Sequence, residues 1–256
     1  MKTTDNTILI TGGGSGIGRG LAEAFHRLGN QVIIAGRGQK TLDETTGANP
    51  GMKSVTLDVS DPKSIQSFAA QLTKDFPPLN VLINNAGMMR PENLLDASND
   101  LSTAEKTVTT NLLGPIRLTA ALLPSLRKQP RATIMNVSSG LAFVPLAMTP
   151  TYCATKAAIH SYTQSLRYQL KTTKVEVIEL IPPYVQTTLM GDQQAEDPRA
   201  MPLDEFVDEV MSILKSEPDV KEVCVKKVYP LRFSAEGGQK KYDQFFQQFN
   251  DSMHAD

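Results

Sequence analysis

The chain has 256 residues, of which 40% are hydrophobic and 21% charged, and its formal net charge is −1. This composition fits a globular enzyme or binding protein, and the charge excludes a general attraction to nucleic acid or an anionic membrane. The two cysteines, Cys153 and Cys224, form no metal-binding spacing and no disulfide framework. The polar start lacks the apolar core of a signal peptide, and no apolar run approaches the ~18 residues that span a bilayer. We therefore expect a cytoplasmic protein that binds no metal, nucleic acid or membrane.

The first elements predict a nucleotide site. An apolar run at residues 8–10 leads into the glycine-rich residues 11–18, a helix with Leu21, Ala22, Phe25 and Leu28 on one face, and a second apolar run at 32–35. This is a strand–helix–strand unit whose glycines let the backbone approach a pyrophosphate at the helix N-terminus. An ordinary glycine-rich turn is the alternative, but the flanking strands favour the nucleotide. The expected contacts are Gly12, Gly14, Ser15, Gly16, Ile17 and Gly18.

The end of the second strand indicates which dinucleotide binds. A site that prefers NAD usually has an acidic residue here, whereas this chain has Arg37 and no acid. A guanidinium suits a 2′-phosphate, which favours NADP(H) as the cofactor. A solvated loop charge is the alternative interpretation of Arg37.

The rest of the chain continues the alternation of strands and helices. Strands are expected at 54–59, 81–83, 133–137, 175–181 and 223–225, and helices at 62–74, 102–128, 152–171 and 203–215. The helix at 102–128 has a candidate kink at Gly114-Pro115, and Asn111 within it is a poor helix former. Asn111 is therefore either a kink residue or a functional polar group.

This alternation predicts the fold class. We expect an α/β protein with a doubly wound, Rossmann-type parallel sheet of about seven strands and helices on both faces. Residues 1–256 would form a single domain, with residues 187–202 as a lid and a tail from about residue 229. In that tail, Phe245, Phe246 and Phe249 would dock a last helix, and the chain would fray from Asp251.

Tyr152 and Lys156 are four residues apart, so they lie on one face of their helix. An ammonium beside a phenol favours the phenolate, so we expect the pKa of Tyr152 to fall. Chance could supply such a pair on a helix surface, and the pair alone would not indicate catalysis. However, the strands before Asn85 and Ser139 end at the same edge of the sheet as the glycine turn. The Ser139 and Tyr152 hydroxyls could there bind a carbonyl and protonate an alkoxide.

Together these motifs resemble the short single-domain branch of the short-chain dehydrogenase/reductase family, along roughly residues 7–228. The Thr-Gly-x-x-x-Gly-x-Gly motif stands at 11–18, the Asn-Asn-Ala-Gly motif at 84–87 and the Asp-Val pair at Asp58-Val59. The phenylalanine-rich tail is most similar to bacterial DltE-like oxidoreductases. The resemblance implies four catalytic residues, Asn111, Ser139, Tyr152 and Lys156. It implies further cofactor contacts from Asp58, Val59, Asn85, Ala86, Gly87, Pro182, Val185 and Thr187, as well as Tyr152 and Lys156.

The resemblance also implies the role of each catalytic residue. Tyr152 would be the general acid in reduction, and Lys156 would hold the nicotinamide ribose and lower the pKa of Tyr152. Ser139 would orient the carbonyl, and the Asn111 backbone would hold a water that relays protons. Pro182-Pro183 departs from the family's Pro-Gly at this point, and a rigid proline would alter the backbone beside the nicotinamide.

The expected substrate is a small apolar carbonyl compound or alcohol, because the predicted crevice is mostly apolar. Its predicted lining is Met88, Met89, Phe143, Val144, Leu146, Tyr184, Leu189 and Met190. Plain core packing is the alternative for the two methionines. A non-catalytic NADP-binding regulator of the same fold is the alternative function, and an epimerase or dehydratase would need a differently spaced glycine turn. Pairing of helices 102–128 and 152–171 between copies would give a homodimer or homotetramer.

Overall fold

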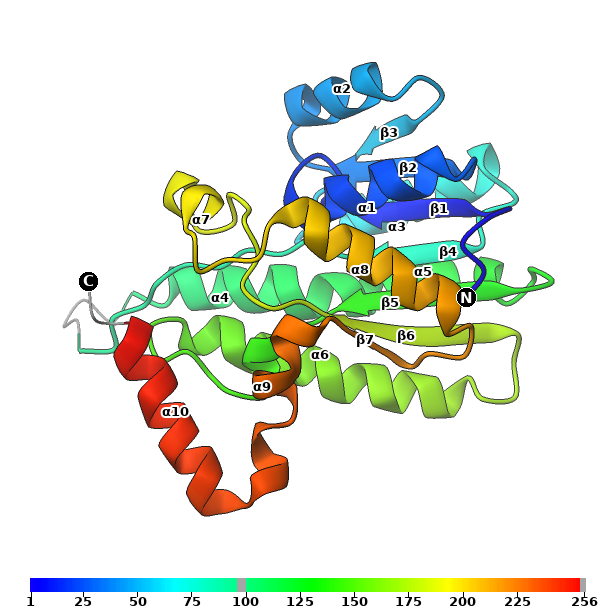
Figure 1. Ribbon diagram of the computed structural model, residues 1–256. Helices are drawn as coiled ribbons and strands as arrows, with labels where there is room; N and C mark the ends of the chain where they lie inside the picture. The colour runs from blue at the N-terminus through cyan, green and yellow to red at the C-terminus, as the bar shows by residue number, and fades with distance from the viewer. Residues whose placement is uncertain (96–99, 254–256) are drawn as a thin grey trace.

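The computed structural model describes residues 1–95 and 100–253. One parallel sheet with the strand order β3-β2-β1-β4-β5-β6-β7 forms its centre (Figure 1). The strands are β1 (Thr7–Thr11), β2 (Gln31–Gly36), β3 (Lys53–Thr56), β4 (Val81–Asn84), β5 (Ala132–Val137), β6 (Val175–Ile181) and β7 (Glu222–Cys224). The predicted seven-stranded, doubly wound sheet is confirmed.

Helices cover both faces of this sheet, because alternate strand residues are apolar in both directions. The α-helices are α1 (Gly16–Arg27), α2 (Gln39–Ala48), α3 (Pro62–Asp75), α4 (Ser102–Val108), α5 (Gly114–Leu126), α6 (Pro150–Gln169), α7 (Asp192–Glu196), α8 (Leu203–Ser216), α9 (Tyr229–Arg232) and α10 (Gln239–Met253). Helices α1 and α8 share one core with the strands, and α3, α5 and α6 share the other. No helix among the described residues is long and apolar enough to cross a membrane.

The sheet changes its direction of growth at β1, which pairs with β2 on one side and β4 on the other. In such a sheet the connections leave β1 and β4 toward opposite faces, and a crevice opens outside their carboxyl ends. These strand ends lie at the left-hand end of Figure 1, where α7 and α10 also lie. The topology therefore places the glycine turn, Ser139 and the start of α6 around one opening.

The expected single helix at 102–128 is interrupted. A π-helical turn, Thr109–Leu113, separates α4 from α5 and contains Asn111. Pro115 causes this interruption, because it has no N–H to donate to the Asn111 carbonyl. The α-helical hydrogen-bond ladder is therefore broken between Asn111 and Pro115. Gly114 allows close packing here, because a Cβ at that position would lie 2.7 Å from the Val59 carbonyl oxygen.

Several expected helix ends and loops differ from the structure. Leu28 is 45% exposed because α1 ends at Arg27. Helix α2 was not predicted, and its weakly amphipathic sequence buries only Leu42 and Thr45. The loop at 187–202 contains the short helix α7. Helix α10 continues to Met253, so the chain does not fray at Asp251, and the rest of that expectation, at 254–256, lies outside the described residues.

Candidate active site

A cavity of about 880 Å³ opens at the carboxyl ends of the strands. It brings together most of the predicted cofactor and catalytic residues. Those on its wall are Gly12, Ser15, Gly16, Ile17, Arg37, Asn85, Ala86, Gly87, Ser139, Tyr152, Lys156, Pro182, Val185 and Thr187. Gly14, Gly18, Asp58, Val59 and Asn111 are not on the wall.

The glycine turn has the geometry of an anion cradle. Gly12 has φ +67°, and a Cβ there would lie 3.0 Å from the Ala86 Cα. A Cβ at Gly18 would lie 2.3 Å from the Gly12 carbonyl oxygen, so α1 and the turn pack without room for a side chain. Ser15, which precedes α1, makes no side-chain capping bond, so the first N–H groups of the helix are open to the cavity. These features fit the pyrophosphate of a dinucleotide.

Thr11 ties the glycine turn to the end of β4. Its hydroxyl accepts hydrogen bonds from the backbone N–H groups of Asn85 at 3.1 Å and Ala86 at 3.0 Å. The Asn85 amide returns a bond of 2.9 Å to the Thr11 carbonyl. The two strand ends therefore form one rigid floor.

The predicted catalytic pair, Tyr152 and Lys156, is buried on α6. Tyr152 is 7% exposed and Lys156 is 5% exposed. Lys156 Nζ lies 5.5 Å from the centre of the Tyr152 ring and donates a 2.8 Å hydrogen bond to the Val137 carbonyl. The Ser139 hydroxyl lies beside the Tyr152 side chain and acts to lower its pKa. Three of the four predicted catalytic side chains therefore meet at one wall of the cavity.

The expected fall in the pKa of Tyr152 was wrong. Burial is the largest effect and raises the pKa of Tyr152 above its usual value, although the neighbouring Ser139 hydroxyl opposes the rise. Burial also lowers the pKa of Lys156 to about 8, and the charge of Glu179 opposes that fall. The sequence pattern indicated proximity but not burial, and burial disfavours the charged form of both groups. Tyr152 is therefore a protonated phenol at neutral pH.

A carboxylate fixes the start of α6, the helix that carries Tyr152 and Lys156. Pro150 opens α6, and Thr149 before it makes no side-chain capping bond. Instead, the Glu92 carboxylate accepts bonds from the Thr151 N–H at 3.1 Å and the Thr151 hydroxyl at 2.7 Å. A negative charge at a helix N-terminus is stabilising. This contact sets the position of Tyr152, which follows in the same turn.

Asn111 supports the cavity from behind. Its side-chain oxygen accepts from the Met88 N–H at 2.8 Å, and its amide donates to the Met88 carbonyl at 2.8 Å. This pair of hydrogen bonds to the backbone holds the segment after β4. The π turn explains why a helix contains this asparagine, and the water relay through its backbone stays a prediction.

The cofactor residues farther from Tyr152 differ in their exposure. Arg37 is exposed at the end of β2 and borders the cavity. Asp58 is half-buried and accepts bonds from the Ser60 N–H at 2.9 Å and hydroxyl at 2.7 Å. Burial alone would raise the pKa of Asp58, but the bonds from Ser60 and the charge of Arg37 hold it below its usual value. Asp58 therefore stays an ionised acceptor.

The segment after β6 is held by polar contacts. The Pro182 carbonyl accepts a 2.9 Å bond from the Gly140 N–H, which joins it to the chain beyond Ser139. The Gln194 amide donates to the Val185 carbonyl at 2.8 Å and to the Thr187 hydroxyl at 3.0 Å. Helix α7 thus fixes the loop that borders the opening.

The substrate side differs from the expectation at two residues. The predicted apolar residues line the cavity except Phe143 and Val144. Val144 is fully buried, and Phe143 turns away to pack against His160, with ring centres 4.7 Å apart, and against the Arg232 guanidinium at 4.6 Å. The short 3-10 turn at Gly140–Ala142 directs this part of the loop out of the cavity.

The sequence reasoning missed the wall contributed by the tail. Leu231, Phe249, Ser252 and Met253 all line the cavity. Asn250 attaches α10 by accepting a 2.6 Å bond from the Ala147 N–H and donating a 3.1 Å bond to the Pro145 carbonyl. The spacing of Phe245, Phe249 and Met253 at intervals of four was the available signal for an apolar helix face.

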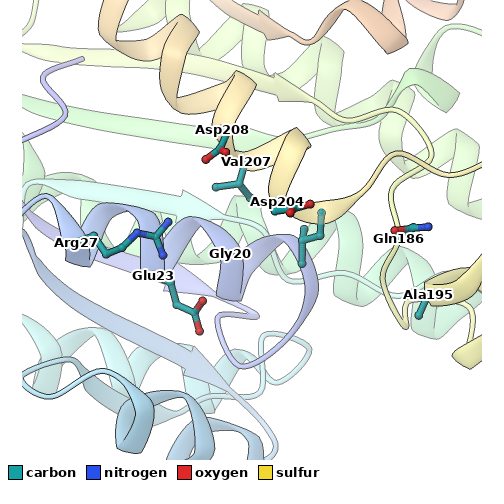
Figure 2. A pocket seen from close by; sticks show the side chains of 9 residues that line it. Gly20, Glu23, Arg27, Gln186, Ala195, Asp204, Val207 and Asp208 are labelled. Atoms are coloured by element: carbon teal, nitrogen blue, oxygen red, sulfur yellow. The ribbon is translucent and has the colours of Figure 1, made fainter.

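A second cavity, of about 450 Å³, lies between α1 and α8. Figure 2 shows Glu23 and Arg27 of α1 on one side and Asp204 and Asp208 of α8 on the other. None of the predicted catalytic residues lines it. The larger cavity, which Ser139, Tyr152 and Lys156 line, is therefore the candidate active site.

The family model described as short chain dehydrogenase matches residues 6–198. This chain belongs to the short-chain dehydrogenase family. It is 40% identical over 253 residues to the uncharacterized oxidoreductase DltE of Bacillus subtilis (strain 168), and 98% of each chain is covered. The chain is thus an oxidoreductase of this family and of its DltE-like subgroup.

Solved structures show the same fold. A short chain dehydrogenase from Burkholderia cenocepacia J2315 in complex with NADP has a TM-score of 0.76 at 25% identity, covering 100% of this chain and 98% of its own. A short chain dehydrogenase/reductase from Burkholderia phymatum in complex with NAD has a TM-score of 0.76 at 22% identity, covering 92% and 95%. Members of this fold therefore include proteins with either dinucleotide.

Proposed function

We propose that this chain transfers a hydride between NADP(H) and a small apolar carbonyl compound or alcohol. The observation that carries the proposal is the meeting of Ser139, Tyr152 and Lys156 on the wall of the cavity into which the glycine turn opens. A bound nicotinamide would supply or accept the hydride. The turn at residues 12–18 would hold its pyrophosphate.

The chain's own residues handle the proton. In reduction, the Ser139 hydroxyl donates a hydrogen bond to the substrate carbonyl, and the Tyr152 phenol gives its proton to the alkoxide that forms. The raised pKa of Tyr152 keeps this proton in place until negative charge develops on the substrate. The Lys156 ammonium then stabilises the tyrosinate. Proton transfer of this kind contributes roughly 10²–10⁴-fold to a rate.

Arg37 supports the choice of NADP(H) over NAD(H). It borders the cavity at the end of β2, where an NAD-preferring site usually has an acid. Solved structures of the same fold hold either NAD or NADP. The proposed preference for NADP(H) therefore rests on Arg37 and not on family membership. A charge-assisted bond contributes roughly 1.5–3 kcal/mol, so Arg37→Asp should weaken NADPH binding by about 10–100-fold and spare NADH. Equal loss for both dinucleotides in a fluorescence titration would contradict the NADP preference.

The apolar wall supports the choice of substrate. Met88, Met89, Leu189 and Met190 face the cavity from two loops, and we propose that residues 187–202 act as a lid over it. Flexible thioether side chains adapt to an apolar molecule of varied shape. Aldehydes, ketones and quinones without charged groups are the compounds to test.

The experiment is a screen for NADPH oxidation over such compounds, with Tyr152→Phe as the blank. The same substitution at Tyr168, 69% exposed on the same helix, is the matched control. We expect Tyr152→Phe to lose turnover while it still binds NADPH, and Tyr168→Phe to behave as wild type. NADPH binding without turnover of any compound would favour the non-catalytic regulator instead.

We also propose a homodimer or homotetramer through the helices of residues 102–128, which are α4 and α5, and through α6. Leu101, before α4, is 64% exposed, and Val108 at the end of α4 is 36% exposed, so large apolar side chains remain uncovered there. Light scattering should give a mass of two or four chains. A mass of one chain would rule this out.

A further inference from the structure

A carboxylate lies inside the apolar layer beneath α6. Residues of β6 alternate between the two faces of the sheet, and Val175 and Val177 belong to the core shared with α3, α5 and α6. Glu179 continues this series and is 0% exposed. Because burying a carboxylate has a high desolvation cost, the residue needs partners that stabilise its charge.

Ser138 and His160 are those partners. The Ser138 hydroxyl donates to Glu179 Oε1 at 2.5 Å, and His160 Nδ1 lies 3.0 Å and 2.8 Å from the two carboxylate oxygens. Adjacent serines therefore serve different groups: Ser139 faces Tyr152, and Ser138 faces Glu179.

Both partners of Glu179 are neighbours of Lys156. His160 follows Lys156 by one turn on α6, so the two side chains project from the same face. Ser138 follows Val137, whose carbonyl accepts the 2.8 Å bond from Lys156 Nζ. The carboxylate is thus held by two neighbours of Lys156, and its charge acts on the ammonium.

A cation from another element, Arg232, is paired with a different carboxylate. Arg232 binds Glu222 through two bonds, at 2.8 Å and 3.2 Å. His160, Glu179 and Glu222 offer ligand atoms within 4.8 Å of one another, but these bonds occupy both carboxylates, so we assign a charge network and not a metal site. The titratable and charged groups around Glu179 and Lys156 are Tyr152 and His160 of α6, Glu222 and Cys224 of β7, and Arg232 of α9.

We propose that Glu179 is a positioning residue for Lys156: its carboxylate, held by Ser138 and His160, keeps the ammonium charged and directed at the catalytic tyrosine. The proposal rests on the proposed function, in which a cationic Lys156 stabilises the tyrosinate. Burial lowers the pKa of Lys156 to about 8, and Glu179 acts against that fall. Loss of the carboxylate would therefore leave Lys156 neutral at a lower pH, and activity on the alkaline side would be lost sooner.

The test is the titration of Lys156 followed by NMR on protein labelled with carbon-13 at the lysine Cε. The Lys156 signal is identified as the one that is absent from the spectrum of Lys156→Met. In Glu179→Gln we expect its midpoint to fall by about one pH unit, the effect of one nearby charge. Glu176→Gln removes a carboxylate from the same strand at a position whose side chain is 55% exposed, and should not move the midpoint. An unchanged midpoint in Glu179→Gln would overturn the proposal.

A second variant covers the case in which Glu179→Gln does not fold. Ser138→Ala removes a hydrogen bond that favours the ionised carboxylate, so Glu179 spends more time protonated and without charge. The Lys156 midpoint should therefore move in the same direction by a smaller amount. The alkaline limb of NADPH turnover should follow the midpoint. Turnover with no shift in either variant would reject the role of Glu179, whereas a shift in a protein without turnover would reject the proposed function alone.

Discussion

The two sides of the large cavity are built in different ways. The cofactor side consists of strand ends and the glycine turn, and backbone contacts join them, such as the 2.6 Å bond from the Gly12 N–H to the Ala35 carbonyl. The substrate side consists of loops and the tail. Single side chains join these segments across long stretches of chain, as Asn250 does with Ala147 and Tyr242 with the Phe143 carbonyl.

This difference indicates which side of the cavity can change its shape without disturbing the fold. The positions of the strand ends follow from the sheet itself, so a change there must disturb the core. The substrate side depends on a few polar contacts between exposed segments, including the 3.2 Å bond from the Tyr184 hydroxyl to Asp197. Its shape can therefore change with little effect on the fold or on cofactor binding.

The largest effect should come from filling the cofactor side. In Gly18→Ala the new Cβ would lie 2.3 Å from the Gly12 carbonyl oxygen, and backbone cannot move aside cheaply. We expect a loss of about 1–3 kcal/mol in the free energy of unfolding and at least about tenfold weaker NADPH binding. Urea denaturation and fluorescence titration measure the two quantities.

Gly47→Ala is the matched control. Gly47 lies in α2, and a Cβ added there would have no heavy atom within 4 Å, so alanine should stabilise the helix by about 0.5–1 kcal/mol. If Gly18→Ala bound NADPH as wild type does, the tight turn would not be part of the cofactor site.

A smaller effect is expected from the substrate side. Asn250→Ala removes the bonds that attach α10 to residues 145 and 147 and so loosens the wall formed by Phe249 and Met253. We expect the KM for an apolar carbonyl substrate to rise by about tenfold, with NADPH affinity unchanged. Gln248→Ala, on an exposed position of the same helix, should change neither quantity. A parallel loss of NADPH affinity would show that the two sides are not independent.

The smallest effect concerns stability and its dependence on pH. Burial lowers the pKa of Lys156 from its usual 10.5 to about 8, so between these values the unfolded chain binds more protons than the folded one. The wild type should therefore gain stability as pH rises from about 8 to 10.5, and carry the full burial penalty below pH 8. Lys156→Met has no such penalty and should be more stable at pH 7 by about 1–2 kcal/mol, after the lost bond to Val137 is allowed for.

Denaturation at several pH values checks this expectation. The advantage of Lys156→Met should shrink as pH rises through the window above 8. Lys174→Met, which removes an exposed charge, should show no such trend. A Lys156→Met protein less stable than the wild type at pH 7 would mean that the buried ammonium stabilises the fold.

The seven strands, the parallel sheet with helices on both faces and most of the cofactor wall could be predicted from the sequence, because apolar periodicity and glycine spacing are local signals. The run before Gly12 and the helix after Ser15 were sufficient to place the turn. The broken helix was half predicted: Pro115 was recognised, but the π turn it produces was not.

The features that could not be predicted depend on contacts between residues far apart in the sequence. Nothing local in the sequence shows that Tyr152 is buried, so the direction of its pKa shift was wrong. The tail wall depends on Asn250 reaching residues about a hundred positions earlier, and Glu179 is one acid in an ordinary strand until His160 and Ser138 are brought beside it. Long-range pairing of polar groups is the part that periodicity does not encode.

The most direct test of the account is a crystal structure of the protein with NADPH. We predict that the adenosine 2′-phosphate contacts Arg37, that the pyrophosphate lies on residues 12–18, and that the nicotinamide leaves room for a carbonyl within about 3–3.5 Å of the Tyr152 hydroxyl. Binding of the dinucleotide in the cavity between α1 and α8, or with its nicotinamide away from Tyr152, would contradict the account.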